Sequence, residues 1–206
     1  MNEPKSAVPR RAMLIAGGSA LAAGGLAFLY PVRDRQFNSI DITGADYARD
    51  FSLPDYSGQL RKLGDFRGRA VAVFFGFTQC PDVCPTTLTE LTRVKQLLGN
   101  DGDRLQVILI TVDPQRDTPQ VLEAYMRNFD PQHLALAPSE QQLAEVTKEF
   151  KIYFKKVEAK TPTAYLMDHS AGTYIFDPSG RARLYARYGL KPEELASDVR
   201  MLLKET

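Results

Sequence analysis

Two cysteines lie four residues apart in the stretch "FFGFTQCPDVCPTTL", which runs from Phe74 to Leu88. They are Cys80 and Cys84, and the chain has no others. Two thiols at this spacing can form a disulfide, act as a redox couple, reduce peroxide or bind a metal ion. If the segment coils helically, the two Cβ atoms come about 5–6 Å apart, whereas a disulfide prefers about 3.8 Å. A metal ion with bonds of about 2.3 Å to sulfur bridges the wider gap, so the spacing favours a metal site without excluding oxidation.

A metal site would need a third ligand, because two sulfurs leave most ions under-coordinated. The chain offers His133, in "FDPQHLALAP", and His169, in "YLMDHSAGTYIFDPSGR". His133 has no polar cluster around it, so we expect a packing or surface role for it. Two thiolates and one imidazole suit Cu(I), and with a further oxygen they suit Cu(II). Structural zinc needs four protein ligands, and with His133 set aside for packing or the surface no fourth thiol or imidazole is left, so copper is the predicted ion.

Three aspartates lie near these candidates along the chain. Asp168 precedes His169 and is predicted to orient its imidazole or to join Cu(II). Asp113 ends an apolar run in "TVDPQRDTP", where it either faces a partner or shapes the turn before a proline. Asp82, between the cysteines, is expected to shape the loop.

The elements that position these residues follow from the hydrophobic pattern. Two apolar runs without alternation, 71–77 and 105–112, predict strands buried on both faces. A helix over about 84–98 places Cys84 in its first turn, where the helix dipole favours a thiolate. The remaining predicted elements are a hairpin over 50–63, a helix starting at Thr118-Pro119, a short strand over 134–137, a helix capped by Ser139 and Gln142, a strand pair over 173–177 and 183–187, and a helix from Pro192.

This order of elements predicts an α/β chain with a mixed central sheet flanked by helices, in the order of a thioredoxin-like fold. In such a fold, the loop before the terminal strand pair lies directly against the dithiol. His169 belongs to that loop, so Cys80, Cys84 and His169 are the predicted metal ligands.

The N-terminal segment differs from the rest of the chain. Residues 12–30, "AMLIAGGSALAAGGLAFLY", carry no charge and as a helix would span roughly 28 Å, close to one bilayer core. We predict a cytoplasmic N-terminus over 1–11, a transmembrane or signal-anchor helix over 12–30, a linker over 31–49 and a copper-binding domain over 50–206. A cleaved signal peptide and a buried helix are the alternatives. The expected location is the bacterial inner membrane, with the domain in the periplasm.

Overall composition excludes some classes of protein. Lysine and arginine number 26 against 25 acidic residues, without a basic stripe that would indicate nucleic acid as a partner. Two cysteines in 206 residues are too few for a disulfide scaffold. The pair is therefore more consistent with a functional site.

From about Asp50 to Leu203 the chain resembles the Sco/SenC family of copper-binding proteins that assemble cytochrome c oxidase. The resemblance rests on "FFGFTQCPDVCPTTL", "ITVDPQRDTPQVLEAYMRNFDP" and "DHSAGTYIFDPSGR", in this order. It implies a membrane-tethered thioredoxin-like domain whose copper ligands match Cys80, Cys84 and His169. It also implies an upstream copper donor, and delivery to the binuclear copper site of oxidase subunit II. Gln79 stands where many members carry a histidine that is not a ligand.

Two enzymatic alternatives also use reactive cysteines, although the prediction is a metallochaperone rather than an enzyme. Thiol–disulfide oxidoreductases carry C-x-x-C and a cis-proline before the terminal hairpin. Here the spacer has three residues and Gly172 takes the place of the proline, so reduction of the client's cysteines stays an alternative or accessory role. Peroxiredoxins carry a threonine three residues before the cysteine, where Cys84 has Pro81.

Overall fold

The computed structural model describes residues 36–158 and 165–205. Residues 37–206 belong to one compact unit, and the elements in its described part follow one another in a mixed α/β order. They are β1 (Ile40–Asp41), β2 (Ser52–Pro54), β3 (Leu60–Lys62), the 3-10 helix η1 (Leu63–Phe66), β4 (Ala70–Gly76), α2 (Val83–Leu98), the 3-10 helix η2 (Gly99–Arg104), β5 (Leu105–Thr111), α3 (Pro119–Met126), β6 (Leu134–Leu136), α4 (Glu140–Glu149), β7 (Phe154–Glu158), β8 (Tyr165–His169), β9 (Thr173–Phe176), β10 (Ala182–Ala186) and α5 (Pro192–Lys204).

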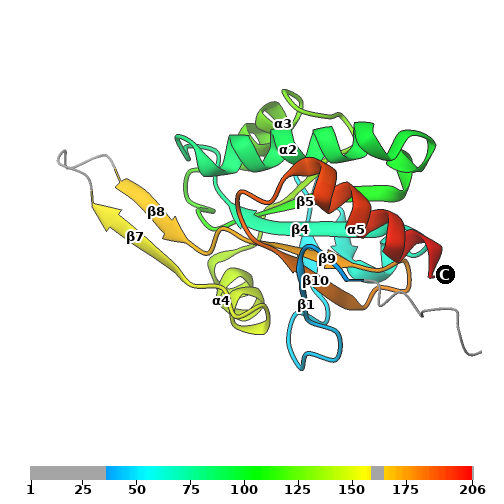
Figure 1. Ribbon diagram of the computed structural model, residues 1–206. Helices are drawn as coiled ribbons and strands as arrows, with labels where there is room; N and C mark the ends of the chain where they lie inside the picture. Colours follow the sequence, from blue (N-terminus) through cyan, green and yellow to red (C-terminus); the bar gives the residue numbers. More distant parts are fainter. Residues whose placement is uncertain (1–35, 159–164, 206) are drawn as a thin grey trace, which may run out of the picture. The chain divides into compact units, whose positions relative to one another are not determined.

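A six-stranded mixed sheet forms the centre of this unit, in the order β1-β10-β9-β4-β5-β6 (Figure 1). Strands β4, β5 and β6 run parallel to one another, whereas β9 is antiparallel to β4 and β10 is antiparallel to β9. Every residue of β4 and of β5 is buried, as the apolar runs predicted. The predicted mixed sheet is therefore confirmed.

Helices cover both faces of this sheet. In Figure 1, α2 and α5 lie together on one side of the strands, and α4 lies on the other. Phe150, at the end of α4, packs its ring 5.4 Å from those of Phe75 and Tyr174. The predicted helix starts are confirmed, because Thr118 caps α3 and Ser139 forms a capping box with Gln142 at α4.

Two further pairs of strands lie outside the main sheet. Strands β2 and β3 form the hairpin expected over 50–63. Strands β7 and β8 form a second hairpin, which extends away from the central sheet (Figure 1). This pair was not predicted from sequence, because "FKKVE" and "YLMDH" are half-exposed strands without the long apolar run of a core strand.

The compact unit begins before the predicted domain boundary at residue 50. Strand β1 pairs with β10 inside the stretch assigned to a linker. The Asp198 carboxylate, which is fully buried in α5, accepts hydrogen bonds from the backbone N–H groups of Asn38 and Ser39 at 2.9 and 2.8 Å. The segment from residue 38 is thus part of the fold because α5 satisfies its polar groups.

The anchor predicted over residues 12–30 lies outside the described residues. Among the helices of the described part, none combines the length and the apolar character needed to cross a bilayer.

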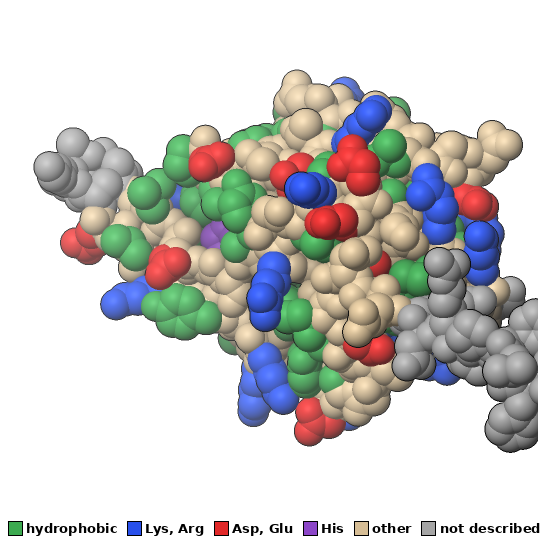
Figure 2. All heavy atoms as spheres, viewed as in Figure 1, with side chains coloured by type: hydrophobic (Ala, Val, Ile, Leu, Met, Phe, Trp, Pro, Cys, Tyr) green, Lys and Arg blue, Asp and Glu red, His purple; other side chains and the backbone are tan. Residues whose placement is uncertain are grey.

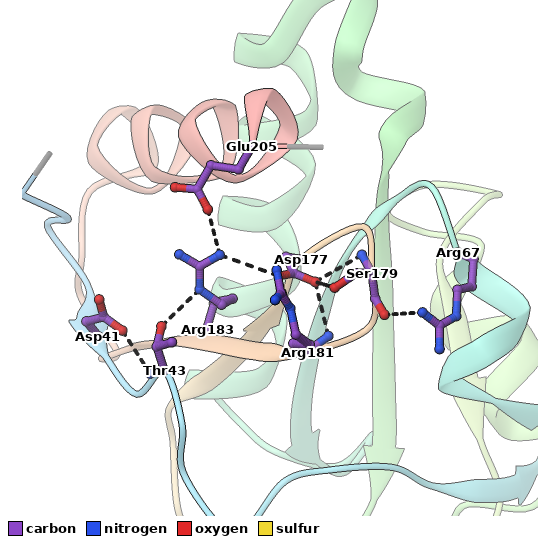
Figure 3. A network of polar contacts seen from close by, with 8 residues as sticks. All are labelled: Asp41, Thr43, Arg67, Asp177, Ser179, Arg181, Arg183 and Glu205. Atoms are coloured by element: carbon purple, nitrogen blue, oxygen red, sulfur yellow. Dashed lines mark hydrogen bonds and ion pairs between the residues drawn. The ribbon is translucent and has the colours of Figure 1, made fainter.

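A polar network joins the β9–β10 turn to the end of α5 (Figure 3). Arg183 lies at its centre, and its guanidinium contacts Asp177 at 3.4 Å and Glu205 at 2.6 Å. Arg183 also donates to the Thr43 hydroxyl at 2.9 Å. These contacts connect β10 to the end of α5 and to the loop after the edge strand β1. All of these residues are distant from the cysteines in the sequence.

Candidate metal centre

The structure brings Cys80, Cys84 and His169 together. One donor atom of each residue lies within 4.8 Å of the other two, and the Cys84 Sγ is 3.6 Å from the His169 Nε2. An ion with three bonds of about 2.3 Å in a trigonal arrangement separates its donors by about 4 Å. The spacing of the donors therefore fits a three-coordinate metal ion.

Strand β4 and helix α2 place the two thiols differently. Cys84 is the second residue of α2 and is 0% exposed, whereas Cys80 lies in the preceding loop and is half-buried. A Cβ atom on Gly76, at the end of β4, would lie 2.7 Å from the Cys84 Sγ. Glycine at this position is what allows α2 to approach the sheet so closely.

The two thiols also differ in acidity. A hydrogen bond from the Cys84 side chain is the largest cause that lowers the pKa of Cys80 to about 5. The backbone N–H of Cys84 contacts the Cys80 Sγ at 3.5 Å and lowers this pKa further. The same side-chain contact, together with burial, raises the pKa of Cys84. The thiolate expected at Cys84 is therefore assigned to Cys80, because the contact of the Cys84 side chain with Cys80 and then its burial outweigh its place at the helix N-terminus.

His169 is the last residue of β8, and its ring orientation is fixed by its neighbours. The Nδ1 atom lies 3.0 Å from the carbonyl oxygen of Ser170. A carbonyl only accepts hydrogen bonds, so Nδ1 carries the proton and the lone pair of Nε2 faces Cys84. The Phe77 ring packs edge to face against the imidazole, with centroids 5.8 Å apart. The imidazole thus has the tautomer that binding of a metal ion through Nε2 would require.

The residue predicted to orient His169 was Asp168, but Nδ1 donates its hydrogen bond to the carbonyl oxygen of Ser170 instead. Successive residues of a strand point to opposite faces. Asp168 is exposed and pairs across the hairpin with Lys155, whereas His169 pairs with Phe154. Asp168 therefore points away from the face that carries the imidazole.

Asp113 is buried rather than available to face a partner. Its side chain is 4% exposed, and its carboxylate forms an ion pair with Arg116. The Tyr165 hydroxyl donates to the same carboxylate at 2.8 Å. Of the two roles considered from the sequence, the structure favours the local one.

Asp117 supports the segment that leads to the cysteines. Its carboxylate accepts hydrogen bonds from the hydroxyls of Thr78 and Thr111, both at 2.6 Å, and from the Thr78 backbone N–H at 3.1 Å. Burial raises the pKa of Asp117. Sequence alone did not reveal this support, since the three residues meet only through the fold.

His133 has the packing role that the sequence analysis predicted. It is 1% exposed, and its Nε2 lies 3.1 Å from the Thr92 hydroxyl oxygen. Burial lowers its pKa to about 4. His133 is thus a neutral core residue, away from the thiols.

Gly172 precedes β9 at the position where a thiol oxidoreductase carries proline. A Cβ atom there would lie 2.1–2.5 Å from atoms of the Tyr185 side chain. Tyr185 takes up the space, so packing within the sheet accounts for this glycine.

Comparisons with known proteins agree on one family. Residues 41–204 match SCO1/SenC. The SCO2-like protein of Rickettsia prowazekii is 39% identical over 132 residues, which are 64% of this chain and 64% of that protein, so the chain spans just under two thirds of that relative. The structure of Bradyrhizobium japonicum ScoI with copper bound is 37% identical, with a TM-score of 0.68, over 74% of this chain and 97% of that one. Yeast Sco1 with copper bound is 30% identical, with a TM-score of 0.69, over 76% and 88%.

Proposed function

We propose a function from one premise, namely that this chain belongs to the SCO1/SenC family. Its described domain is a copper chaperone in which Cys80, Cys84 and His169 bind the ion. The ion is delivered to the binuclear copper site of cytochrome c oxidase subunit II. The observation that carries this proposal is the cluster of two sulfurs and one imidazole nitrogen within 4.8 Å. Such soft donors suit copper better than magnesium or calcium.

Transfer by ligand exchange is consistent with the burial of the three donors. Cys84 is fully buried, whereas Cys80 and His169 are half-buried. A thiol of the client reaches the ion from the side of Cys80 and His169, and each new bond to the client replaces one of theirs. In Figure 2, hydrophobic side chains gather over the N-terminal end of α2, beside the β7–β8 hairpin. An apolar surface around the ion supports docking of a protein client.

Residues 12–30 are the proposed anchor in the bacterial inner membrane, with the domain in the periplasm. The support is the uncharged stretch of this length in the sequence. The proposal predicts that the full chain stays with the membrane fraction after an alkaline wash, and that protease added to spheroplasts cleaves the domain. Release by the wash would contradict it.

Replacement of His169 tests the ligand set. We expect His169→Ala to weaken copper retention by more than 100-fold in a competition titration, because one of three ligands is lost. The fold should persist, since the side chain lies half-exposed on a hairpin outside the main sheet. Both thiols should remain titratable. The matched control is His133→Gln, which changes the only other histidine and should leave copper retention within about twofold of the parent.

One alternative function uses the same two thiols without the imidazole. Both cysteines are free, and the low pKa of Cys80 suits a thiol–disulfide oxidoreductase that reduces the client's cysteines. If His169→Ala retained copper like the parent while the domain reduced insulin disulfides rapidly, this alternative would replace the copper proposal. One equivalent of zinc and no copper, with both ions supplied, would also reject that proposal.

A further inference from the structure

The third donor of the site is carried by an element outside the main sheet. His169 ends β8, which among the described strands pairs only with β7 in a separate two-stranded sheet. Cys84, by contrast, begins a helix that packs on the central strands. The distance between the imidazole and the thiols therefore depends on what fixes the hairpin against the cysteine-bearing loop.

Arg116 contacts both sides of this junction. Its Nη1 donates to the backbone carbonyl of Tyr165 at 2.9 Å, at the start of β8. The same nitrogen donates to the Gln79 side chain at 3.1 Å, directly before Cys80. One guanidinium thus joins the strand that carries His169 to the loop that carries Cys80.

Aromatic rings add to this connection. The Arg116 guanidinium lies 3.5 Å from the centroid of the Tyr165 ring and 5.7 Å from that of the Phe77 ring. Phe77 in turn packs against the His169 imidazole. Cation–π contacts of this kind are strongest where water is excluded, and the Arg116 side chain is only 18% exposed.

Asp113 fixes the guanidinium in this orientation. Its carboxylate accepts from the Arg116 Nε and, through its other oxygen, from the Tyr165 hydroxyl. Both side chains are largely buried, so removal of either one would leave the charge of the other buried and uncompensated. Lysine would not replace arginine here, because a single ammonium lacks the planar fork that serves Asp113, Gln79 and the ring of Tyr165 together.

We propose that Arg116 is a positioning residue that holds β8 against the Cys80 loop and thereby sets the place of the His169 imidazole at the metal site. This inference rests on the proposed function in that His169 is taken as a copper ligand. Arg116 is not one of the proposed ligands and acts only through the hairpin.

The first test uses the metal-free domain. We expect Arg116→Leu to raise amide hydrogen exchange in β7 and β8 at least tenfold, while exchange in β4 and β5 stays within about twofold of the parent. Arg116→Lys keeps the charge beside Asp113 and should give the same pattern to a smaller degree, which covers the case in which the leucine variant does not fold. Unchanged exchange in β7 and β8 in the folded variants would overturn the inference.

The second test is a double-mutant cycle on copper affinity. We expect Arg116→Leu to weaken copper binding about 10–100-fold, as typical changes outside the ligand shell do, and to alter the nitrogen hyperfine signal of the Cu(II) complex. In a His169→Ala background the same change should have less than about twofold effect, because the imidazole it positions is gone. Arg49→Leu removes an exposed arginine paired with Glu149 and is the control.

The outcomes separate the two proposals. If His169→Ala alone leaves copper affinity unchanged, the ligand set is wrong whatever Arg116 does. If His169→Ala weakens binding but the folded Arg116 variants bind copper like the parent, only the positioning role is wrong. Equal losses from Arg116→Leu with and without His169 would also reject it, because they would indicate a general effect on the fold.

Discussion

At the residue scale, Cys80 and Cys84 are in contact but lie in different environments. Cys84 is buried in α2 against β4 and its side chain donates a hydrogen bond, whereas Cys80 is half-buried and accepts it. The helix N-terminus contributes through the backbone N–H of Cys84, which points at the Cys80 sulfur. The N-terminus of α2 thus stabilises a thiolate at Cys80 rather than at Cys84.

This asymmetry predicts a low titration midpoint for Cys80. Its pKa is lowered to about 5, so alkylation of the reduced, metal-free domain should increase as pH rises through about 5, well below the usual range of a thiol. In Cys84→Ala the donor of the largest lowering contact is lost, and the midpoint should move upward. The measurement is the rate of iodoacetamide labelling against pH. A midpoint above about 8 in the parent would contradict the assignment.

The clustering of the three proposed ligands could be predicted from sequence, but the contacts that position them could not. Cys80 and Cys84 belong to one short motif, and the element order places His169 beside them. Arg116 and Tyr165 are 49 residues apart and meet only through the β7–β8 hairpin, which has no strong pattern of its own. Asp168 was predicted to orient His169 because the two are neighbours in sequence. Successive residues of a strand point to opposite faces, so Asp168 points away from the imidazole.

At the element scale, the site depends on the close approach of α2 to β4. The long apolar runs predicted the buried strands, and the capping residues predicted the helix starts, because both signals are local. What sequence does not reveal is the distance between the elements. Gly76 allows the close approach, because the Cys84 sulfur occupies the space that a side chain at this position would need.

We therefore expect Gly76→Ala to affect stability and metal binding together. The new methyl would meet the Cys84 Sγ at 2.7 Å and the Leu109 side chain at 3.1 Å, so α2 or the thiol must shift. Overpacking of this kind costs about 1–3 kcal/mol of unfolding free energy, and copper affinity should fall by about tenfold or more. Thermal unfolding and a competition titration measure the two effects. Gly64→Ala, where nothing lies within 4 Å of the new atom, should change neither.

At the scale of the whole molecule, one buried carboxylate fixes the first residues of the compact unit to α5. Asp198 accepts four hydrogen bonds from the backbone and side chains of Asn38 and Ser39, at 2.7–2.9 Å. Sequence composition placed these residues in a linker, because a polar stretch without periodicity carries no sign of a partner 160 residues later.

Removal of that carboxylate should loosen the beginning of the domain. Asp198→Ala leaves the buried N–H of Ser39 without its acceptor, which should lower the unfolding free energy by about 3 kcal/mol and the Tm by about 6–12 °C. Limited proteolysis should then cut near residue 40 before it cuts elsewhere in the described domain. Asp46→Ala, which removes an exposed partner of Lys151, should leave the Tm within about 1 °C of the parent. A Tm of Asp198→Ala equal to that of the parent would refute this role.

The late position of β9 and His169 in the chain has a consequence for biosynthesis. Cys84 and His169 are 85 residues apart, and β9, which follows His169, occupies the middle of the sheet between β4 and β10. At about 5–20 residues per second, a ribosome takes about 4–17 seconds to pass from one donor to the other. During that interval a nascent chain displays two thiols without an imidazole, so any ion captured then meets only part of the proposed ligand set. The complete proposed ligand set is thus available to copper only after His169 has been synthesised.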